Sequence, residues 1–157
     1  MDGVAINIKG YEVLISKCDL ERIQSHNWCK AANQNKRVYF GYRAYGQNEK
    51  FIYLHRFIVD CPSGMEVDHV NMNTLDNRRE NLRICSHARN NCNKRKYKTN
   101  TSGYKGVYWH KQRLKWVAEI TSNRKKTYLG CFLTAEEAYA AYCIASKKYH
   151  DEYGRTV

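Results

Sequence analysis

Proline is almost absent from this sequence: Pro62 is the only one in 157 residues. The chain also has no Cys-x-x-Cys pair, although it contains seven cysteines. An odd number of cysteines without that spacing argues against both a disulfide framework and a zinc ribbon. The simpler interpretation is that the cysteines are small buried residues in a reducing cytoplasm.

Long apolar runs are missing as well. No segment approaches the ~20 apolar residues that a membrane-spanning helix needs. The first residues, Met1-Asp2-Gly3, are followed by neither a basic stretch nor a long apolar stretch, so no signal peptide is predicted. We therefore expect a cytoplasmic protein without a membrane partner.

Acidic residues are scarce in one segment. Residues 94–130 contain eleven lysines and arginines but a single acid, Glu119, so this segment carries a net charge of +10 out of +12 for the whole chain. Positive charge concentrated in one short segment points to a polyanionic partner, most often a nucleic acid. A solvated basic face and an anionic membrane surface remain as alternatives.

Alternating apolar residues divide the first half of the chain into short strands and helices. The first third is β-rich and shows no motif for chemistry. Residues 65–93 then predict a strand, a loop rich in Asn and Asp at 71–77, a second strand, and a helix capped by Ser86. The elements expected in the first third are a hairpin over residues 4–16, a helix from its cap Asp19 to His26, strands over 28–32 and 37–45, a turn at 46–48, a strand over 51–53 and a helix over 54–59.

The last third predicts a three-stranded antiparallel sheet packed on one helix. Strands are expected over residues 104–109, 116–121 and 127–132. Thr134 and Glu137 have the spacing of a capping box, and the fold class is therefore α+β. The helix that follows is predicted to end at Gly154. Its predicted buried face consists of Ala138, Ala141, Tyr142, Ala145 and Tyr149.

The stretch from residue 67 to residue 93 holds residue types that suit phosphodiester cleavage. The Asp68 carboxylate and the Asn90 amide are hard oxygen ligands, which suit Mg²⁺, Mn²⁺ or Ca²⁺. His69 has a side chain that titrates near neutral pH and can accept a proton from water. Asn81 can tie the long loop to the backbone and hold His69 in place. On spacing alone, a purely structural role remains the alternative.

The same stretch resembles the HNH endonucleases of phages and mobile introns, of the homing type. The resemblance is carried by Leu54-His55-Arg56, Val67-Asp68-His69, Leu75-Asp76-Asn77-Arg78, Glu80-Asn81-Leu82-Arg83 and Asn90-x-x-Asn93. It implies a ββα-metal fold, with a core at about residues 65–93 of a domain spanning residues 1–93.

The resemblance also implies roles for individual residues. Asp68 and Asn90 are the expected ligands of one Mg²⁺ or Mn²⁺ ion, His69 is the expected general base, and Asn81 is the expected structural Asn of the motif. Many relatives outside the homing group have His where this chain has Asn90, which weakens any case for zinc. The positions expected close to the site are His55, Arg56, Arg83 and Asn93.

A second resemblance covers residues 103–150, after a basic linker at residues 94–102. Tyr104-Lys105-Gly106-Val107, residues 116–120, residues 128–132 and residues 134–138 resemble the DNA-binding domain of plant ethylene-response factors, which implies a DNA-binding domain over residues 103–157. Tyr, His and Thr replace several contact residues of the plant proteins, so their base preference is not transferred. The expected DNA contacts are Lys94, Arg95, Lys96 and Lys98 in the linker and Lys105, Tyr108, His110, Arg113, Thr121, Lys126 and Tyr128 in the domain.

These features together predict a site-specific, metal-dependent endonuclease that binds double-stranded DNA and acts on no small molecule. It would work in the host cytoplasm if a phage encodes it, and a monomer is favoured because no dimer seam is visible. A non-cleaving DNA-binding protein, either a regulator or a decayed endonuclease, is the alternative. A structural-zinc RNA binder is a third, disfavoured by the missing cysteine pairs.

Overall fold

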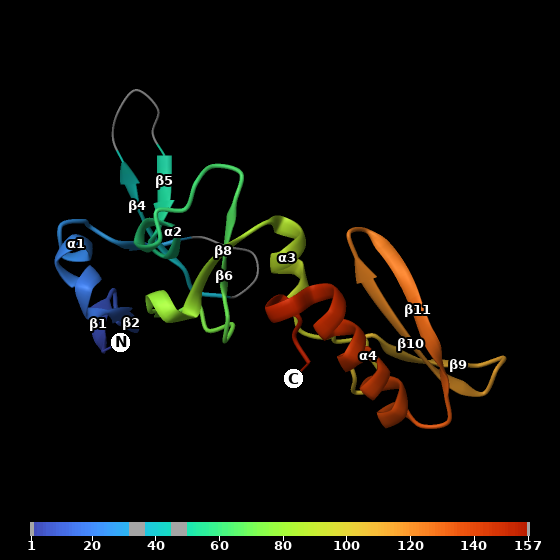
Figure 1. Ribbon diagram of the computed structural model, residues 1–157. Helices are drawn as coiled ribbons and strands as arrows, with labels where there is room; N and C mark the ends of the chain where they lie inside the picture. The colour runs from blue at the N-terminus through green and yellow to red at the C-terminus, as the bar shows by residue number, and fades with distance from the viewer. Residues whose placement is uncertain (1, 32–36, 45–49, 157) are drawn as a thin grey trace. The chain divides into compact units, whose positions relative to one another are not determined.

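The computed structural model describes residues 2–31, 37–44 and 50–156 (Figure 1). The fold is α+β, with several small sheets and few helices. The chain divides into two compact units, Met1–Ser86 and His87–Val157. Within the described residues, none of the helices has the length and hydropathy that spanning a membrane requires.

The first unit begins with the predicted hairpin. Strands β1 (Gly3–Ile8) and β2 (Tyr11–Ser16) are antiparallel. They are joined by Lys9 and Gly10, both at positive φ, and the Asn7 side chain accepts a hydrogen bond from the Gly10 amide at 3.1 Å. Glycine tolerates this backbone conformation without steric cost, which explains its place in the turn.

A third strand of this sheet was not predicted. Strand β7 (Asp76–Asn77) pairs in parallel with β2, although its residue types favour turns. Both residues are buried, and the Arg78 guanidinium donates two hydrogen bonds of 2.8 Å to the Asp76 carboxylate. These partners satisfy the polar side chain of Asp76, so tertiary contacts override its turn preference.

The helix after the hairpin differs from the prediction. A single 3-10 turn, η1 (Lys17–Asp19), leads into α1 (Leu20–Gln24), which ends before His26. Asp19 makes no capping hydrogen bond. Its carboxylate is buried and accepts two hydrogen bonds from the Arg79 guanidinium, at 2.8 and 2.7 Å. Asp19 therefore holds the predicted N-cap position, but its side chain does not cap the helix, because a distant arginine engages the carboxylate.

A second sheet has the order β3-β4-β5. Strands β3 (Cys29–Lys30), β4 (Phe40–Ala44) and β5 (Lys50–Tyr53) pair in antiparallel fashion and lead directly into helix α2 (Leu54–Ile58). The predicted connection at 33–36 and the predicted turn at 46–48 lie outside the described residues. The core that unites both sheets consists of Ile8, Val13, Ile15, Ile23, Trp28, Phe40, Leu54, Ile58, Val67 and Leu82.

The central strands form as predicted. Strand β6 (Glu66–His69) pairs in antiparallel fashion with β8 (Leu82–Cys85), which places Asp68 opposite Arg83 and His69 opposite Leu82. A short 3-10 turn, η2 (Arg79–Asn81), ends the intervening loop. The β6-β8 pair thus carries His69 at its end.

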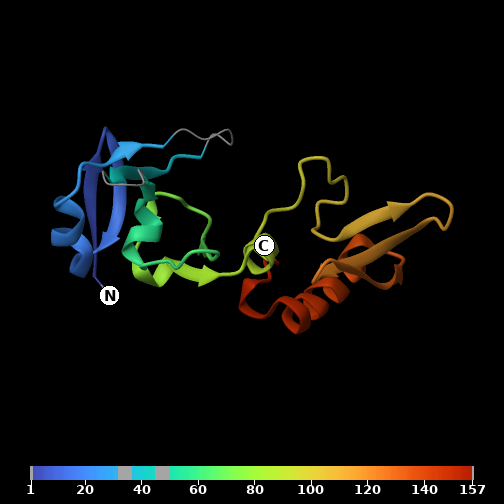
Figure 2. The ribbon, with the colours of Figure 1, turned by 90° about the horizontal axis from the view of Figure 1, so that it is seen from above.

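The second unit contains the predicted sheet and helix. Its elements are α3 (His87–Cys92), β9 (Val107–His110), β10 (Lys115–Ser122), β11 (Lys125–Phe132), α4 (Ala135–His150) and η3 (Asp151–Tyr153). The sheet is antiparallel with the order β11-β10-β9, and α4 lies along one of its faces (Figure 2). The core between helix and sheet includes Val107, Ala118, Ile120, Ala138 and Tyr142.

Helix α4 begins at the predicted capping box, in which Thr134 and Glu137 satisfy each other's backbone amides. Its buried stripe differs toward the C-terminal end. Tyr149 is 42% exposed, whereas Ser146 and His150 are buried. The His150 ring bonds to the Thr121 carbonyl of the sheet at 2.9 Å, which turns this face inward.

Helix α4 also ends earlier than predicted. It stops at His150, and Asp151 follows at a φ of 49°. Gly154 comes only after the 3-10 turn η3, at a φ of −75°. The residue with positive φ that ends the helix is therefore Asp151 and not Gly154. A prediction that expects glycine at this position places the end of the helix too late.

Candidate functional site

His69 lies at the end of β6, where its ring is held by a defined chain of hydrogen bonds. Its Nε2 atom is 3.3 Å from Oδ1 of Asn77. The Asn77 amide is itself oriented, because its Nδ2 donates to the Thr74 carbonyl at 3.1 Å. An amide oxygen only accepts, so this network assigns the proton to Nε2 and makes Nδ1 the unprotonated nitrogen of the ring.

The His69 ring lies close to the rings of His55 and Tyr39. The ring of His55 lies 5.3 Å from it and the ring of Tyr39 lies 6.3 Å from it. Burial lowers the pKa of His69 below its ordinary value. Burial, together with the neighbouring His69 and Arg56, lowers the pKa of His55 to about 3. Both imidazoles are therefore neutral at pH 7, the state in which His69 can accept a proton.

Asp68, the neighbour of His69, is 5% exposed and its carboxylate is paired with the guanidinium of Arg83. Its Oδ2 atom accepts hydrogen bonds from Nε and Nη2 of Arg83, at 2.9 and 2.7 Å. A buried carboxylate needs such a positive partner. A carboxylate oxygen is the donor type that a hard divalent cation prefers, but here Arg83 already supplies the positive charge next to Oδ2. Within the described ranges, no group of three His, Cys, Asp or Glu side chains has the arrangement of a metal site.

Asn81 fastens the loop between β6 and β8. Its Nδ2 donates to the Asp76 carbonyl at 2.7 Å, and its Oδ1 accepts from the Asn71 amide at 3.0 Å. Its own carbonyl accepts from the Val70 amide at 2.9 Å. One buried side chain thus ties both ends of the loop that follows His69.

Arg56 acts as a clamp inside the first unit. Its guanidinium donates to the backbone carbonyls of Met65, Pro62 and Cys61, at 2.7, 3.0 and 3.4 Å. These bonds tie α2 to the start of β6. Arg56 thus lies close in the chain to the His69 site, but its guanidinium is directed at backbone.

Asn90 and Asn93 lie in the second unit. Asn90 is partly buried on α3, and its carbonyl accepts from the amide of the buried Asn93 at 3.2 Å just after the helix. In the same unit, Nζ of Lys105 donates to the Cys92 carbonyl at 2.6 Å. Burial lowers the pKa of Lys105. The ammonium group of Lys105 therefore stabilises the end of α3.

The face of the β9-β11 sheet that α4 does not cover carries a polar network. The Tyr108 hydroxyl donates to Glu119 at 3.0 Å, and Lys126 forms an ion pair with the same carboxylate at 2.9 Å. Burial alone raises the pKa of Glu119, but the bonds from Lys126 and Tyr108 hold it below its ordinary value. We call this face the open sheet face, and it is formed by Tyr108, Glu119, Thr121, Lys126, Tyr128 and Cys131.

A second network lies at the other end of the open sheet face. The Tyr128 hydroxyl and the Arg113 guanidinium bond to Sγ of Cys131, at 3.0 and 3.5 Å. These two bonds lower the pKa of the Cys131 thiol. The amide of Arg113 bonds to Nδ1 of His110 at 3.3 Å, which fixes the turn between β9 and β10.

The basic segment before the sheet is exposed over residues 94–99. Its later part is fixed to the second unit: Ser102 Oγ donates to the Val107 carbonyl at 2.8 Å, and Asn100 Nδ2 donates to the Tyr104 carbonyl at 2.9 Å. The lysine side chain of Lys96 bonds to the Gly103 carbonyl. Lys94, Arg95 and Lys98 thus present charge at the surface beside a segment that packs on β9.

Two family models match the chain. One, described as HNH endonuclease, covers residues 53–92, and the other, described as AP2 domain, covers residues 102–152. The chain carries an HNH endonuclease domain followed by an AP2 domain. The HNH match contains His69 with its neighbours Asp68 and Asn77, and the AP2 match contains the whole open sheet face. The two resemblances found in the sequence are thereby confirmed at the level of the domains, HNH endonuclease and AP2.

One curated protein is similar to part of the chain. The chain is 37% identical over 65 residues to Protein 3.8 of Escherichia phage T7. The match covers 41% of this chain and 54% of that protein, so the chain spans about half the length of the relative. No solved structure matches the chain.

The HNH domain contains functional candidates that sequence reasoning missed. Asn77, rather than Asn81, is the residue whose side chain bonds to His69. Tyr39 lies next to the His69 ring although it is 30 positions away in the sequence and outside every motif. Asn77 belongs to the segment Leu75-Asp76-Asn77-Arg78, so the motif contained a signal for it. Tyr39 had no such signal.

Proposed function

We propose that this protein is a metal-dependent DNA endonuclease that hydrolyses phosphodiester bonds. The observation that carries the proposal is the state of His69 inside the HNH match. Its ring is neutral, is held by Asn77 through Nε2, and stands beside a buried carboxylate. That arrangement suits a general base with Nδ1 directed to a water molecule.

In the proposed mechanism, each residue has a separate task. His69 Nδ1 takes the proton from the attacking water, and Asn77 keeps the ring in the tautomer that allows it. Asp68 and Asn90 are the proposed holders of one Mg²⁺ or Mn²⁺ ion, which would neutralise developing charge at the phosphate. Asn81 keeps the loop after His69 closed, so the base stays in position.

The proposed division of labour assigns cleavage to residues 1–93 and DNA binding to residues 103–157, joined by the basic segment 94–102. The open sheet face would meet the major groove, and exposed lysines and arginines would neutralise phosphates. We exclude Lys105 from the direct contacts because its side chain is partly buried and its ammonium group donates to a backbone carbonyl, whereas Lys96 and Lys126 are exposed. The proposed contacts are Lys94, Arg95, Lys96, Lys98, Tyr108, His110, Arg113, Thr121, Lys126 and Tyr128.

A site-specific, homing-type role in a mobile element is also part of the proposal. It is supported by the motif resemblance and by the similarity to a phage protein. The site of action would then be the cytoplasm of the host cell.

The chemistry of the product ends tests the proposed reaction. Purified protein is incubated with supercoiled plasmid in the presence of Mg²⁺ or Mn²⁺, and nicked or linear products are treated with DNA ligase. Hydrolysis that leaves a 5′-phosphate and a 3′-hydroxyl predicts that ligase reseals the products. Ends that ligase does not seal contradict this reaction, and run-off sequencing of the same products gives the target site.

A second candidate function is DNA binding without cleavage. It is favoured by one observation, the guanidinium of Arg83 on the Asp68 carboxylate, because that contact also suits a purely structural ion pair. Tight DNA binding with no nicking under any divalent metal would support this candidate.

A further inference from the structure

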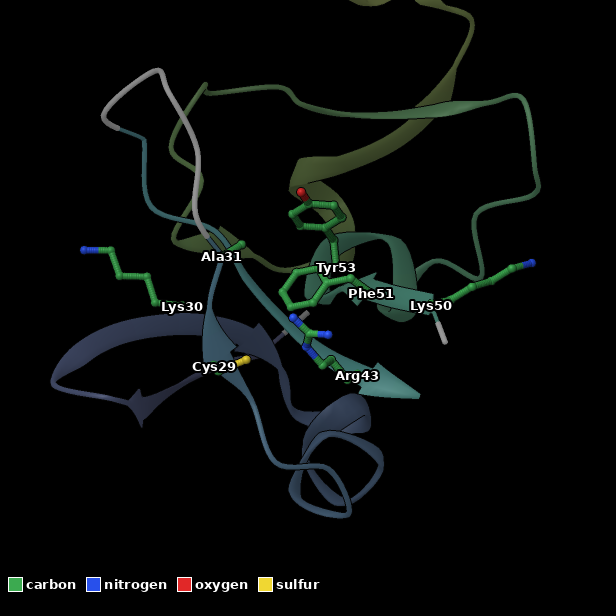
Figure 3. A pocket seen from close by; sticks show the side chains of 7 residues that line it. All are labelled: Cys29, Lys30, Ala31, Arg43, Lys50, Phe51 and Tyr53. Atoms are coloured by element: carbon green, nitrogen blue, oxygen red, sulfur yellow. The ribbon is translucent and has the colours of Figure 1, made fainter. Parts of the chain in front are cut away.

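A pocket lies on the β3-β4-β5 sheet of the first unit, in the third of the chain where the sequence shows no motif. Its volume is about 490 Å³, within the ~300–1,000 Å³ of typical ligand sites. Figure 3 shows the rings of Phe51 and Tyr53 between Lys30 on one side and Lys50 on the other. The residues that line this pocket, which we call the β3-β5 pocket, are Cys29, Lys30, Ala31, Arg43, Lys50, Phe51 and Tyr53.

The strand register explains why this face carries Arg43, Phe51 and Tyr53, whereas Lys30 and Lys50 are paired with Phe40 and Ala44 and flank the face from either side. Cross-strand partners point to the same face of a sheet, and Arg43 is paired with Phe51 while Gly41 is paired with Tyr53. The intervening residues Phe40 and Tyr42 pack into the core. The outward face therefore presents an arginine and two aromatic rings, where a merely solvated sheet face would present polar residues.

Gly41 makes room for one of these rings. A Cβ atom at this position would lie 2.4 Å from Cε1 of Phe51, so any other residue would displace the ring. Phe51 is 38% exposed although its ring packs directly against the backbone of Gly41. The glycine thus holds an apolar ring at the surface, an arrangement that burial in the core does not explain.

The charge of the pocket is positive. Three of its seven lining residues are basic and, among these described residues, none is acidic. Lys30 is held in place by the Tyr11 hydroxyl, which accepts from its Nζ at 2.7 Å. Basic side chains around exposed aromatic rings are the usual combination for nucleic acid, in which cations meet phosphates and rings pack on sugars or bases.

The β3-β5 pocket is continuous with the candidate active site through a row of rings. Phe51 lies 5.2 Å from Tyr53, Tyr53 lies 5.5 Å from His55, and His55 lies 5.3 Å from His69, measured between ring centroids. All four rings belong to the first unit. A DNA strand whose phosphate reaches His69 would therefore extend past Tyr53 toward Arg43 and Lys50.

From these observations we infer that the β3-β5 pocket is a second DNA-binding site, one that grips the backbone of the strand next to the cleaved bond. This inference rests on the proposed function of His69. Arg43, Lys50 and Lys30 neutralise phosphates, and the rings of Phe51 and Tyr53 pack against a deoxyribose or base. The AP2 domain then supplies one contact with the DNA and the first unit supplies another.

Salt dependence of binding tests this inference without requiring cleavage. Duplex DNA from the cut site, or plasmid fragments if no site is found, is bound to full-length His69→Ala protein and to the same protein with Arg43→Gln and Lys50→Gln. Each lost phosphate contact lowers the slope of log K against log salt by about 0.9. We expect a slope smaller by about 1.8 in the double variant and a hydroxyl-radical footprint that is shortened on one side.

Lys9→Gln is the matched control, because Lys9 is exposed on the β1-β2 turn of the same unit and outside the pocket. Phe51→Ala tests the ring separately and is expected to weaken binding several-fold with little change in slope. A double variant with the slope and footprint of the Lys9→Gln protein would overturn the inference. Failure of the proposed function has a different signature, which is absence of cleavage by the protein with His69 intact.

Discussion

Among single residues, His55 has the most perturbed environment of the site. It is neutral in the folded protein, with a pKa lowered to about 3, and it titrates near 6.5 when unfolded. Below pH 6.5, His55 binds a proton in the unfolded chain but not in the folded chain. The free energy of unfolding therefore decreases as the pH falls from 6.5 toward 3. The loss is about 1.4 kcal/mol for each pH unit over this window.

Replacing His55 by Phe keeps an aromatic ring and removes the titration. We predict that the free energy of unfolding, measured with urea between pH 4.5 and 7.5, falls less steeply with acid in His55→Phe than in the original protein. His69 is also neutral through burial, so part of the slope remains. His87→Gln, at an exposed position, is the control. Equal slopes in all three proteins would contradict this account of His55.

Asp68 and Arg83 form the second residue-level test. Arg83→Gln leaves the Asp68 carboxylate, 5% exposed, without its guanidinium partner. Breaking a buried pair in this way costs about 3 kcal/mol of unfolding free energy. The double variant Asp68→Asn with Arg83→Gln removes both charges and is predicted to regain much of that stability.

A metal titration adds a readout that is independent of cleavage. Mg²⁺ is expected to raise the Tm of Arg83→Gln more than that of the original protein, because a divalent ion would supply the missing positive charge. A double variant as unstable as Arg83→Gln, together with no shift in Tm by Mg²⁺, would show that the pair does not act as inferred.

At the scale of elements, the open sheet face offers a natural probe in Cys131. Bonds from Tyr128 and Arg113 lower the pKa of this thiol, whereas burial raises the pKa of Cys85 to about 11. Thiolates react with iodoacetamide and thiols do not. We predict that Cys131 is alkylated at least about tenfold faster than Cys85 at pH 7.5, as read by mass spectrometry of peptides.

The same probe tests where DNA binds. If the open sheet face lies on DNA, duplex DNA protects Cys131 from alkylation. Cys18 is exposed in the first unit and outside both proposed contact faces, so its rate serves as the reference. An unchanged rate at Cys131 under saturating DNA would place the contact elsewhere.

Elements with regular periodicity could be predicted from the sequence, and those fixed by distant partners could not. The hairpin β1-β2, the pair β6-β8 and the sheet β9-β11 follow from local alternation of apolar residues. Strand β7 could not be predicted from local alternation, because Asp76 is stabilised by Arg78 and by strand β2, which is far away in the chain. The same is true of the Asp19 side chain, because Arg79, 60 positions later, takes its carboxylate.

The site shows the same limit. Asp68, His69 and Asn81 could be named as candidates from the sequence, because the segments that carry the family resemblance are local in the chain. Asn77 and Tyr39 reach His69 only through the fold, by the loop after β6 and by the approach to β4. The β3-β5 pocket is likewise invisible in sequence, because it forms only when β3, β4 and β5 pair in register and place Cys29 opposite Gly41 and Arg43 opposite Phe51.

For the whole molecule, two modules share one proposed task. The HNH domain holds the candidate base, and the AP2 domain holds an organised polar face that suits DNA. If the modules act together, a variant that fails to cleave must still bind DNA. This separation of binding from cutting is the feature that distinguishes an endonuclease from a DNA-binding protein without catalysis.

The most direct measurement is therefore cleavage and binding by His69→Ala beside the original protein. Both are incubated with the same DNA and Mg²⁺ or Mn²⁺, and binding is followed by mobility shift under identical conditions. We predict that the original protein cuts, and that His69→Ala binds with unchanged affinity but cuts at least about a hundredfold more slowly. Equal cutting by the two proteins would contradict the assignment of His69 as the base.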